Sequence, residues 1–157
     1  KIRNEFIFQM PRPNIPVVEP EIETQPIAAA PLVVERNGRL ILPTLNLEIK
    51  MTPLFKALYL FFLSKPEGVT LSSLCDYNAE ILNIYIKLRP SVAVEDATRR
   101  VENLTHPNGD GFNPAKAHIN RIINDLLPAL AVFYRISGNR GGTYSIQLPR
   151  GLIDIRF

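Results

Sequence analysis

The feature that most constrains the fold is an amphipathic segment, residues 114–127, which runs almost directly into a glycine-rich hairpin pattern. At about 100° per residue its apolar side chains fall on one side of a helix. They are Ala115, Ile119, Ile122, Ile123 and Leu126, with Leu127 at the edge. Pro128 breaks this helix, and two alternating arms, 132–137 and 143–148, then flank the sequence GNRGG. Because glycine supplies the backbone freedom that a turn needs, we expect a β-hairpin with its tip at 138–142.

The preceding residues predict a small sheet and a core helix. Residues 32–42 are typical of an antiparallel β-hairpin, because apolar arms flank Asn37-Gly38, a pair suited to positive φ. The alternating residues 45–50 predict a further half-buried strand. Thr52 as a side-chain cap and Pro53 at the first helical position should open a helix that is apolar on nearly every side.

Three more helices complete the predicted α+β domain. Residues 69–74 are compatible with a strand or a single helical turn, and Asp76 is positioned to cap a helix that ends near residue 88. Residues 95–104 predict a shorter helix. The final helix can be capped by Asn113 and started by Pro114. We therefore expect one domain over residues 32–157 with four helices.

Positive charge is concentrated in the last third of the chain. Residues 114–157 contain six Lys and Arg against two Asp and Glu, a net charge of +4, whereas the other 113 residues contain twelve against thirteen. The outer side of the final helix carries polar and basic side chains: Lys116, His118, Asn120, Arg121 and Asn124. Amide and guanidinium groups hydrogen-bond base edges, and Lys suits phosphate. The pattern favours a polyanion-binding surface, with an ordinary solvated helix face as the alternative.

The amino-terminal residues 1–31 differ from the rest of the chain. Five prolines fall between Pro11 and Pro26, so we expect an extended, Pro-rich arm or linker. Residues 6–10 alternate in a way that suits an edge strand added to this subunit or to another, which would give a homodimer or a domain-swapped arm. A tail without a partner is the equally open alternative.

The sequence argues against an enzyme. It contains neither the serine-hydrolase elbow, nor the phosphate-binding loop, nor the HExxH zinc motif. His106 and His118 lie 12 residues apart without nearby cysteines or closely spaced acids, so we expect no metal, no cofactor and no catalytic residues. The most apolar run, residues 57–63, is far shorter than the roughly 20 residues of a bilayer span. With no secretory signal either, we expect no membrane contact and a cytoplasmic location.

Four stretches of the chain resemble the winged-helix effector domain of bacterial OmpR-type response regulators. Residues 48–54 (EIKMTPL) and 65–68 (KPEG) are similar to that family's last amino-terminal strand, helix start and helix exit. Residues 116–122 (KAHINRI) resemble its recognition helix, and residues 140–146 (RGGTYSI) resemble its wing. The resemblance covers about residues 32–149, although residues 69–113 are longer than in the family and imply an extra or enlarged helix.

This resemblance implies a winged helix-turn-helix protein that binds double-stranded DNA in transcriptional regulation. The 114–127 helix would enter the major groove, and the 138–142 wing would contact the backbone or the minor groove. The implied contacts are the five outer helix residues named above plus Asn139 and Arg140 from the wing. Asn124 and Asp125 stand where the family has further basic residues, so binding should be weak unless a dimer or another basic segment helps. The remaining alternative is a winged-helix-like protein–protein interaction module that uses the wing and residues 76–105.

Overall fold

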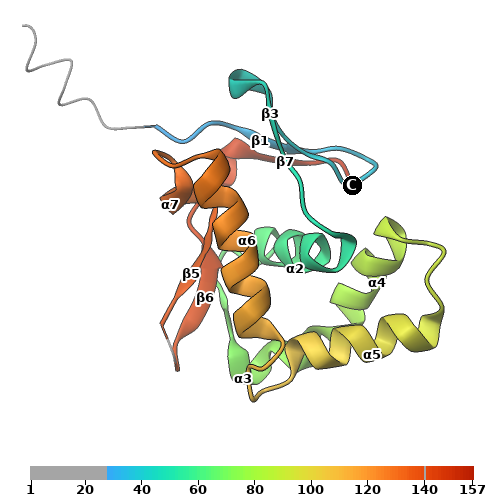
Figure 1. Cartoon of the computed structure of the whole chain (residues 1–157). Coiled ribbons are helices and arrows are strands. Elements are labelled where there is room, and N and C mark those ends of the chain that lie inside the picture. The colour runs from blue at the N-terminus through green and yellow to red at the C-terminus, as the bar shows by residue number, and fades with distance from the viewer. Residues whose placement is uncertain (1–27, 140) are drawn as a thin grey trace, which may run out of the picture.

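The structure is a computed structural model that describes residues 28–139 and 141–157 (Figure 1). The predicted arm, apart from residues 28–31, and the predicted contact Arg140 lie outside these described residues. Within them the chain is α+β, as predicted. Four helices have 11 to 15 residues: α2 (Pro53–Leu63), α4 (Asn78–Leu88), α5 (Val94–Thr105) and α6 (Phe112–Leu126). Two short helices, α3 (Leu71–Leu74) and α7 (Ala131–Tyr134), accompany them.

One sheet of four strands has the order β3-β2-β1-β7, with β1 (Leu32–Val34), β2 (Leu40–Leu42), β3 (Leu47–Ile49) and β7 (Ile153–Ile155). The predicted antiparallel hairpin of β1 and β2 is confirmed. Gly38 in its turn has φ +89°, and a Cβ there would meet Leu88 Cδ2 at 2.3 Å, so both the backbone conformation and the close packing require glycine. Strand β7 pairs in parallel with β1 and was not predicted.

The second sheet has the order β4-β6-β5 and contains the predicted carboxy-terminal hairpin. Strands β5 (Ile136–Gly138) and β6 (Thr143–Ile146) are antiparallel, and β4 (Val69–Thr70) pairs with β6. The predicted first arm, 132–137, was too long, because residues 131–134 form the helix α7. That helical turn carries Tyr134 into the core, where its side chain is fully buried.

Helix α2 is the centre of the core, as its apolar sequence predicts. Every residue from Ala57 to Leu63 is buried. Pro53 occupies the first helical turn as predicted, but Thr52 makes no side-chain cap. Its carbonyl oxygen instead accepts a hydrogen bond from the Lys56 N–H at 2.8 Å. The predicted Thr52 cap is therefore wrong, although the helix start is right.

At three other helix starts, the structure either differs from the sequence prediction or decides between its alternatives. Residues 69–74 form both alternatives, strand β4 and then α3, whose N-cap Thr70 accepts the Ser73 N–H with its hydroxyl. Asp76 caps nothing, because it lies in a 3₁₀ turn and α4 starts at Asn78. Helix α6 starts two residues before Pro114, at Phe112, so Asn113 is not its cap.

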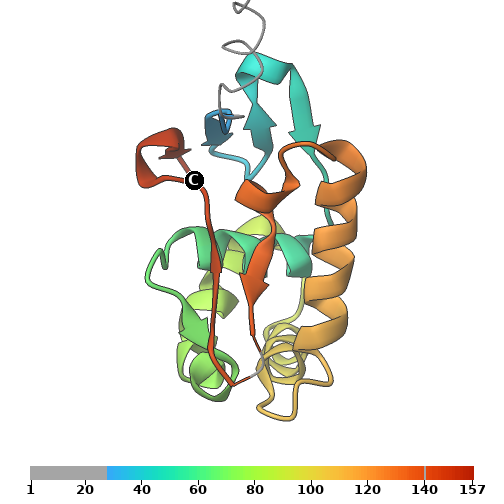
Figure 2. The ribbon, with the colours of Figure 1, turned by 90° about the vertical axis from the view of Figure 1, so that its left-hand side faces the viewer.

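The early start of α6 has a packing reason. Phe112 is fully buried, with its ring 5.0 Å from that of Tyr144 on β6 and 6.0 Å from that of Phe62 on α2. This aromatic row joins two helices and the second sheet. Figures 1 and 2 both show α6 standing beside the β5–β6 hairpin, and Figure 1 shows α4 on the other side of α2.

Candidate nucleic-acid interface

Helix α6 has one buried side and one side open to solvent. Ala115, Ile119 and Ile123 are at most 1% exposed, which confirms the apolar side predicted from the sequence. One continuous arc of the helix is exposed within the described part of the chain: Asn113, Ala117, Arg121 and Asn124, with Asp125 at its far end. The helix is therefore accessible to a partner along this arc.

A pair of hydrogen bonds fixes α6 against the hairpin. The Asn120 side-chain amide donates to the Ile136 carbonyl oxygen and accepts the Ile136 N–H, both at 2.9 Å. These two hydrogen bonds resemble those that a neighbouring strand would make, since they satisfy both the N–H and the carbonyl oxygen of one β5 residue. Asn120 is half-buried, so its amide serves to position the hairpin and is not turned towards an external ligand.

A groove of about 390 Å³ lies between α6 and β5, and Asn120 and Ile136 are part of its lining. Its lining includes Lys116 and Asn124 from α6 and Arg135, Ser137 and Asn139 from the hairpin side. Two of the predicted contacts, Lys116 and Asn124, are thus brought together with a third, Asn139. Among the described residues that line the groove, most side chains are polar and none is acidic.

Within residues 28–139 and 141–157, two cations border the groove. Lys116 is half-buried with its Nζ 5.7 Å from the ring centroid of Tyr144, which draws this ammonium towards β6. Arg135 immediately precedes β5 and was not predicted as a contact. Its position could not be found from helical periodicity, because it depends on the fold of residues 131–136. In the described residues, none of the ion pairs involves Lys116, Arg121 or Arg135.

His118 lies on the other side of α6. Its ring is 5.2 Å from that of Phe55 on α2, and it is half-buried there. Arg99 and Arg100 are also separate from the groove, since Arg99 pairs with Asp96 at 2.9 Å and Arg100 donates to the Tyr85 hydroxyl at 3.1 Å. Lys116 and Arg135 therefore line the groove beside the hairpin, and Arg121 is exposed on α6 outside the groove lining. We call these three residues the α6–β5 basic cluster.

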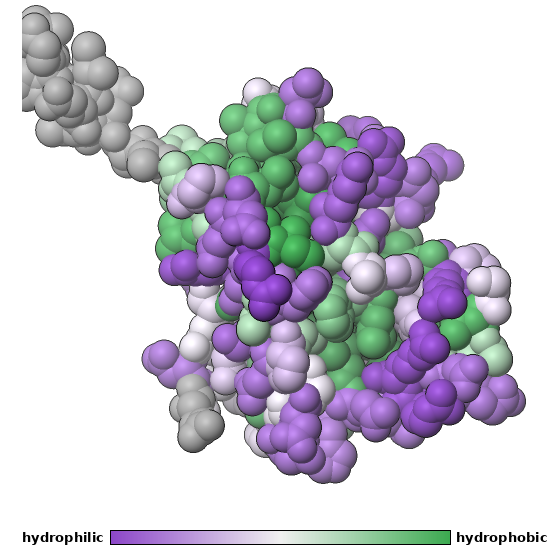
Figure 3. All heavy atoms as spheres, viewed as in Figure 1, coloured by the Kyte–Doolittle hydropathy of each residue, from purple (hydrophilic) through white to green (hydrophobic). Residues whose placement is uncertain are grey.

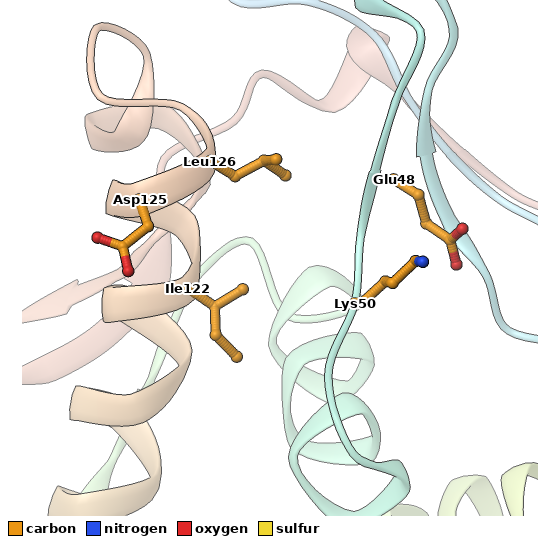
Figure 4. A pocket seen from close by; sticks show the side chains of 5 residues that line it. All are labelled: Glu48, Lys50, Ile122, Asp125 and Leu126. Carbon is orange, nitrogen blue, oxygen red and sulfur yellow. The ribbon is translucent and has the colours of Figure 1, made fainter.

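A second groove, also of about 390 Å³, lies on the opposite side of α6. Figure 4 shows Ile122 and Leu126 pointing from α6 towards the β3 strand, which contributes Glu48 and, just beyond its end, Lys50. Figure 3 shows apolar surface in this region, between the upper part of α6 and β3. Helix α6 thus separates a polar groove with two cations from a mainly apolar one.

The described residues contain no group of three or more His, Cys, Asp and Glu side chains that could hold a metal ion. None of the helices in the described ranges combines the length and the apolar character that crossing a bilayer requires. Comparison with protein-family models, with curated proteins and with solved structures gives no match to this chain.

Proposed function

We propose that this chain is a DNA-binding winged-helix protein that acts in transcriptional regulation. In this proposal α6 is the recognition helix and the β5–β6 hairpin is the wing, which contacts backbone or minor groove. The observation that carries the proposal is the α6–β5 basic cluster, in which Arg121 belongs to the exposed arc of α6 while Lys116 and Arg135 line the neighbouring groove. Basic side chains that flank a helix with exposed amides are suited to phosphate contacts around a helix placed in the major groove.

The order of elements supports the same proposal. Strand β4 follows the core helix α2 and pairs with the carboxy-terminal hairpin, so the hairpin is attached to the helical core. The Asn120 hydrogen bonds then fix the hairpin relative to α6. A rigid helix and hairpin can bind a duplex together without first being ordered, which avoids an entropy cost on binding.

The proposal predicts weak, salt-sensitive binding. If each of the three cations in the α6–β5 basic cluster neutralises one phosphate, the logarithm of the affinity should fall with the logarithm of salt concentration with a slope of about −2.7. The affinity should then decrease about 40-fold between roughly 50 and 200 mM salt. This expectation is specific enough to test without knowing a target sequence.

The test is fluorescence anisotropy with a mixed-sequence DNA duplex over a range of salt concentrations. The double variant Arg121→Ala/Arg135→Ala should bind more weakly, with a slope near −0.9. The control Arg36→Ala/Arg89→Ala removes the same charge from two exposed sites elsewhere and should keep the wild-type slope. No binding by the wild-type protein at about 50 mM salt, or equal effects of the two double variants, would contradict the proposal.

A second candidate function is protein–protein assembly. The apolar groove beside Ile122 and Leu126 is one surface that such a module could use. Val94 on α5, which is 59% exposed, is another, within the region 76–105 predicted for an assembly interface. Failure to bind any duplex at low salt would favour this second function.

A further inference from the structure

The outer edge of strand β5 faces the groove between α6 and β5, which we call the α6–β5 groove. In an antiparallel ladder, residues alternate between those that bond to the partner strand and those whose N–H and carbonyl oxygen point away from it. Both main-chain groups of Ile136 bond to the Asn120 side chain on α6, so Ile136 is of the outward kind. Gly138 follows two residues later in the same strand and lines the groove. Its N–H and carbonyl oxygen therefore point into the groove as well.

Lys116 lies level with Gly138 along the groove. Helix α6 and strand β5 run in opposite directions (Figures 1 and 2). From the bonded pair of Asn120 and Ile136, one turn back along α6 to Lys116 covers about 6 Å, and two residues forward along β5 to Gly138 cover about 6.6 Å. An independent contact agrees, because the Lys116 Nζ lies 5.7 Å from the ring centroid of Tyr144, the β6 residue that pairs with Gly138. The ammonium group and the outward N–H therefore lie at the same end of the groove.

The rest of the groove lining adds a second cation and further hydrogen-bond donors. Arg135 contributes a guanidinium, Asn124 and Asn139 contribute exposed amides, and Ser137 contributes a hydroxyl. Among the described residues, no acidic side chain lines the groove, and no ion pair involves Lys116 or Arg135. Charge-assisted hydrogen bonds to an oxyanion are about twice as strong as neutral ones. A volume of about 390 Å³ is within the range of small-ligand pockets.

We propose that the α6–β5 groove is a binding site for a phosphate group. The phosphate oxygens accept hydrogen bonds from the Lys116 ammonium and the Gly138 N–H, and the Arg135 guanidinium supplies the second positive charge. Glycine is suited to this position, since without a side chain its N–H stays open to the ligand. The outward Gly138 carbonyl oxygen accepts a hydrogen bond from water or from a hydroxyl of the ligand. The inference goes beyond the proposed function, because a free phosphate ester would fill the site as well as the backbone of DNA.

The test is a two-dimensional NMR titration of the full chain with inorganic phosphate, at an ionic strength held constant with chloride. Saturable shifts should appear at the amides of Lys116, Asn124 and residues 137–139. The Gly138 amide proton should move downfield as its N–H gains a charged acceptor. Chloride alone should not produce these shifts. The Gly138 signal is the probe because a substitution there would disturb the contact with β6, where a Cβ would lie 2.4 Å from the Thr143 carbonyl oxygen.

Two variants test the cations separately. Lys116→Gln and Arg135→Gln should each raise the dissociation constant for phosphate about tenfold, because each removes one charge-assisted hydrogen bond. The control Arg36→Gln/Arg89→Gln removes two exposed cations outside the groove and should leave the dissociation constant unchanged. Shifts that do not saturate, shifts that chloride reproduces, or equal effects of the groove and control variants would overturn the site, whatever the protein does with DNA.

A duplex titration then identifies the source of the phosphate and separates this inference from the proposed function. If a mixed-sequence duplex shifts the same amides and free phosphate competes with it, the site holds the DNA backbone and both proposals stand. If phosphate binds but the duplex leaves the Gly138 amide unshifted, the site stands as a pocket for a small phosphate ester, and the groove is rejected as a DNA-binding surface. Duplex binding without any saturable phosphate response in the groove would leave the function standing and overturn the site.

Discussion

The two hydrogen bonds between Asn120 and Ile136 allow a sharp test of how the hairpin is held. The change Asn120→Asp keeps the size and shape of the side chain but replaces its NH₂ donor with an acceptor. The Ile136 N–H can still donate to the carboxylate, whereas the Ile136 carbonyl oxygen, 2.9 Å from the amide nitrogen in the wild type, then faces another oxygen.

The expected magnitude follows from these contacts. One lost neutral hydrogen bond costs about 1 kcal/mol, and an acceptor left against another acceptor adds roughly 1–2 kcal/mol. We therefore expect the free energy of unfolding to fall by about 2–3 kcal/mol. The matched control is Asn124→Asp, one helical turn further along in the same groove, where the side chain is exposed. It introduces the same charge near the same cations and should change stability by at most about 0.5 kcal/mol.

Urea denaturation followed by circular dichroism measures both variants. The midpoint for Asn120→Asp should decrease by about 1 M relative to wild type with an unchanged slope, while the midpoint for Asn124→Asp should hardly move. If the two substitutions lower the midpoint equally, the reasoning is refuted. The effect would then come from added negative charge and not from the loss of a donor to Ile136.

Two further predictions concern backbone packing and buried phenols. Gly138→Ala should destabilise the hairpin strongly, because a Cβ there would lie 2.4 Å from the Thr143 carbonyl oxygen, whereas a Cβ at Gly151 meets nothing within 4 Å. Thermal melts should therefore separate Gly138→Ala from a nearly neutral Gly151→Ala. Because burial raises the pKa of Tyr59 and Tyr134, their contribution to stability is complete below about pH 10, the unfolded pKa, and is lost as the pH rises towards the folded values. Ultraviolet titration should show these two phenols ionising only as the circular dichroism of the fold disappears; all five tyrosines ionising before any unfolding would be the contrary result.

Local patterns in the sequence predicted much of the fold. The periodicity of α6, the Asn37-Gly38 turn and the apolar α2 all depend on residues close together in the chain, and all three are confirmed. Strand β7 was missed because its three residues pair with β1, about 120 positions earlier, and so few residues give little signal. The helix starts shifted where a buried side chain such as Phe112 overrode the local capping signal.

The candidate site was predicted only in part for the same reason. Lys116, Arg121 and Asn124 follow from the helical wheel, since their environment is set mainly by α6 itself. The wheel also placed Asn120 on the outer face, but the neighbouring strand β5 covers that position. Arg135 lies at the groove next to Tyr134, which is hydrogen-bonded to Ala30. These two residues are 104 positions apart, so no local pattern reveals their contact.

The most direct test of the proposed function is an NMR titration of the wild-type protein with a mixed-sequence duplex at low salt. The account predicts that amide shifts concentrate on the exposed arc of α6, from Asn113 to Asn124, and on the β5–β6 hairpin, and that they disappear as salt rises. Shifts confined to α4 and α5, or no shifts on adding DNA, would contradict it.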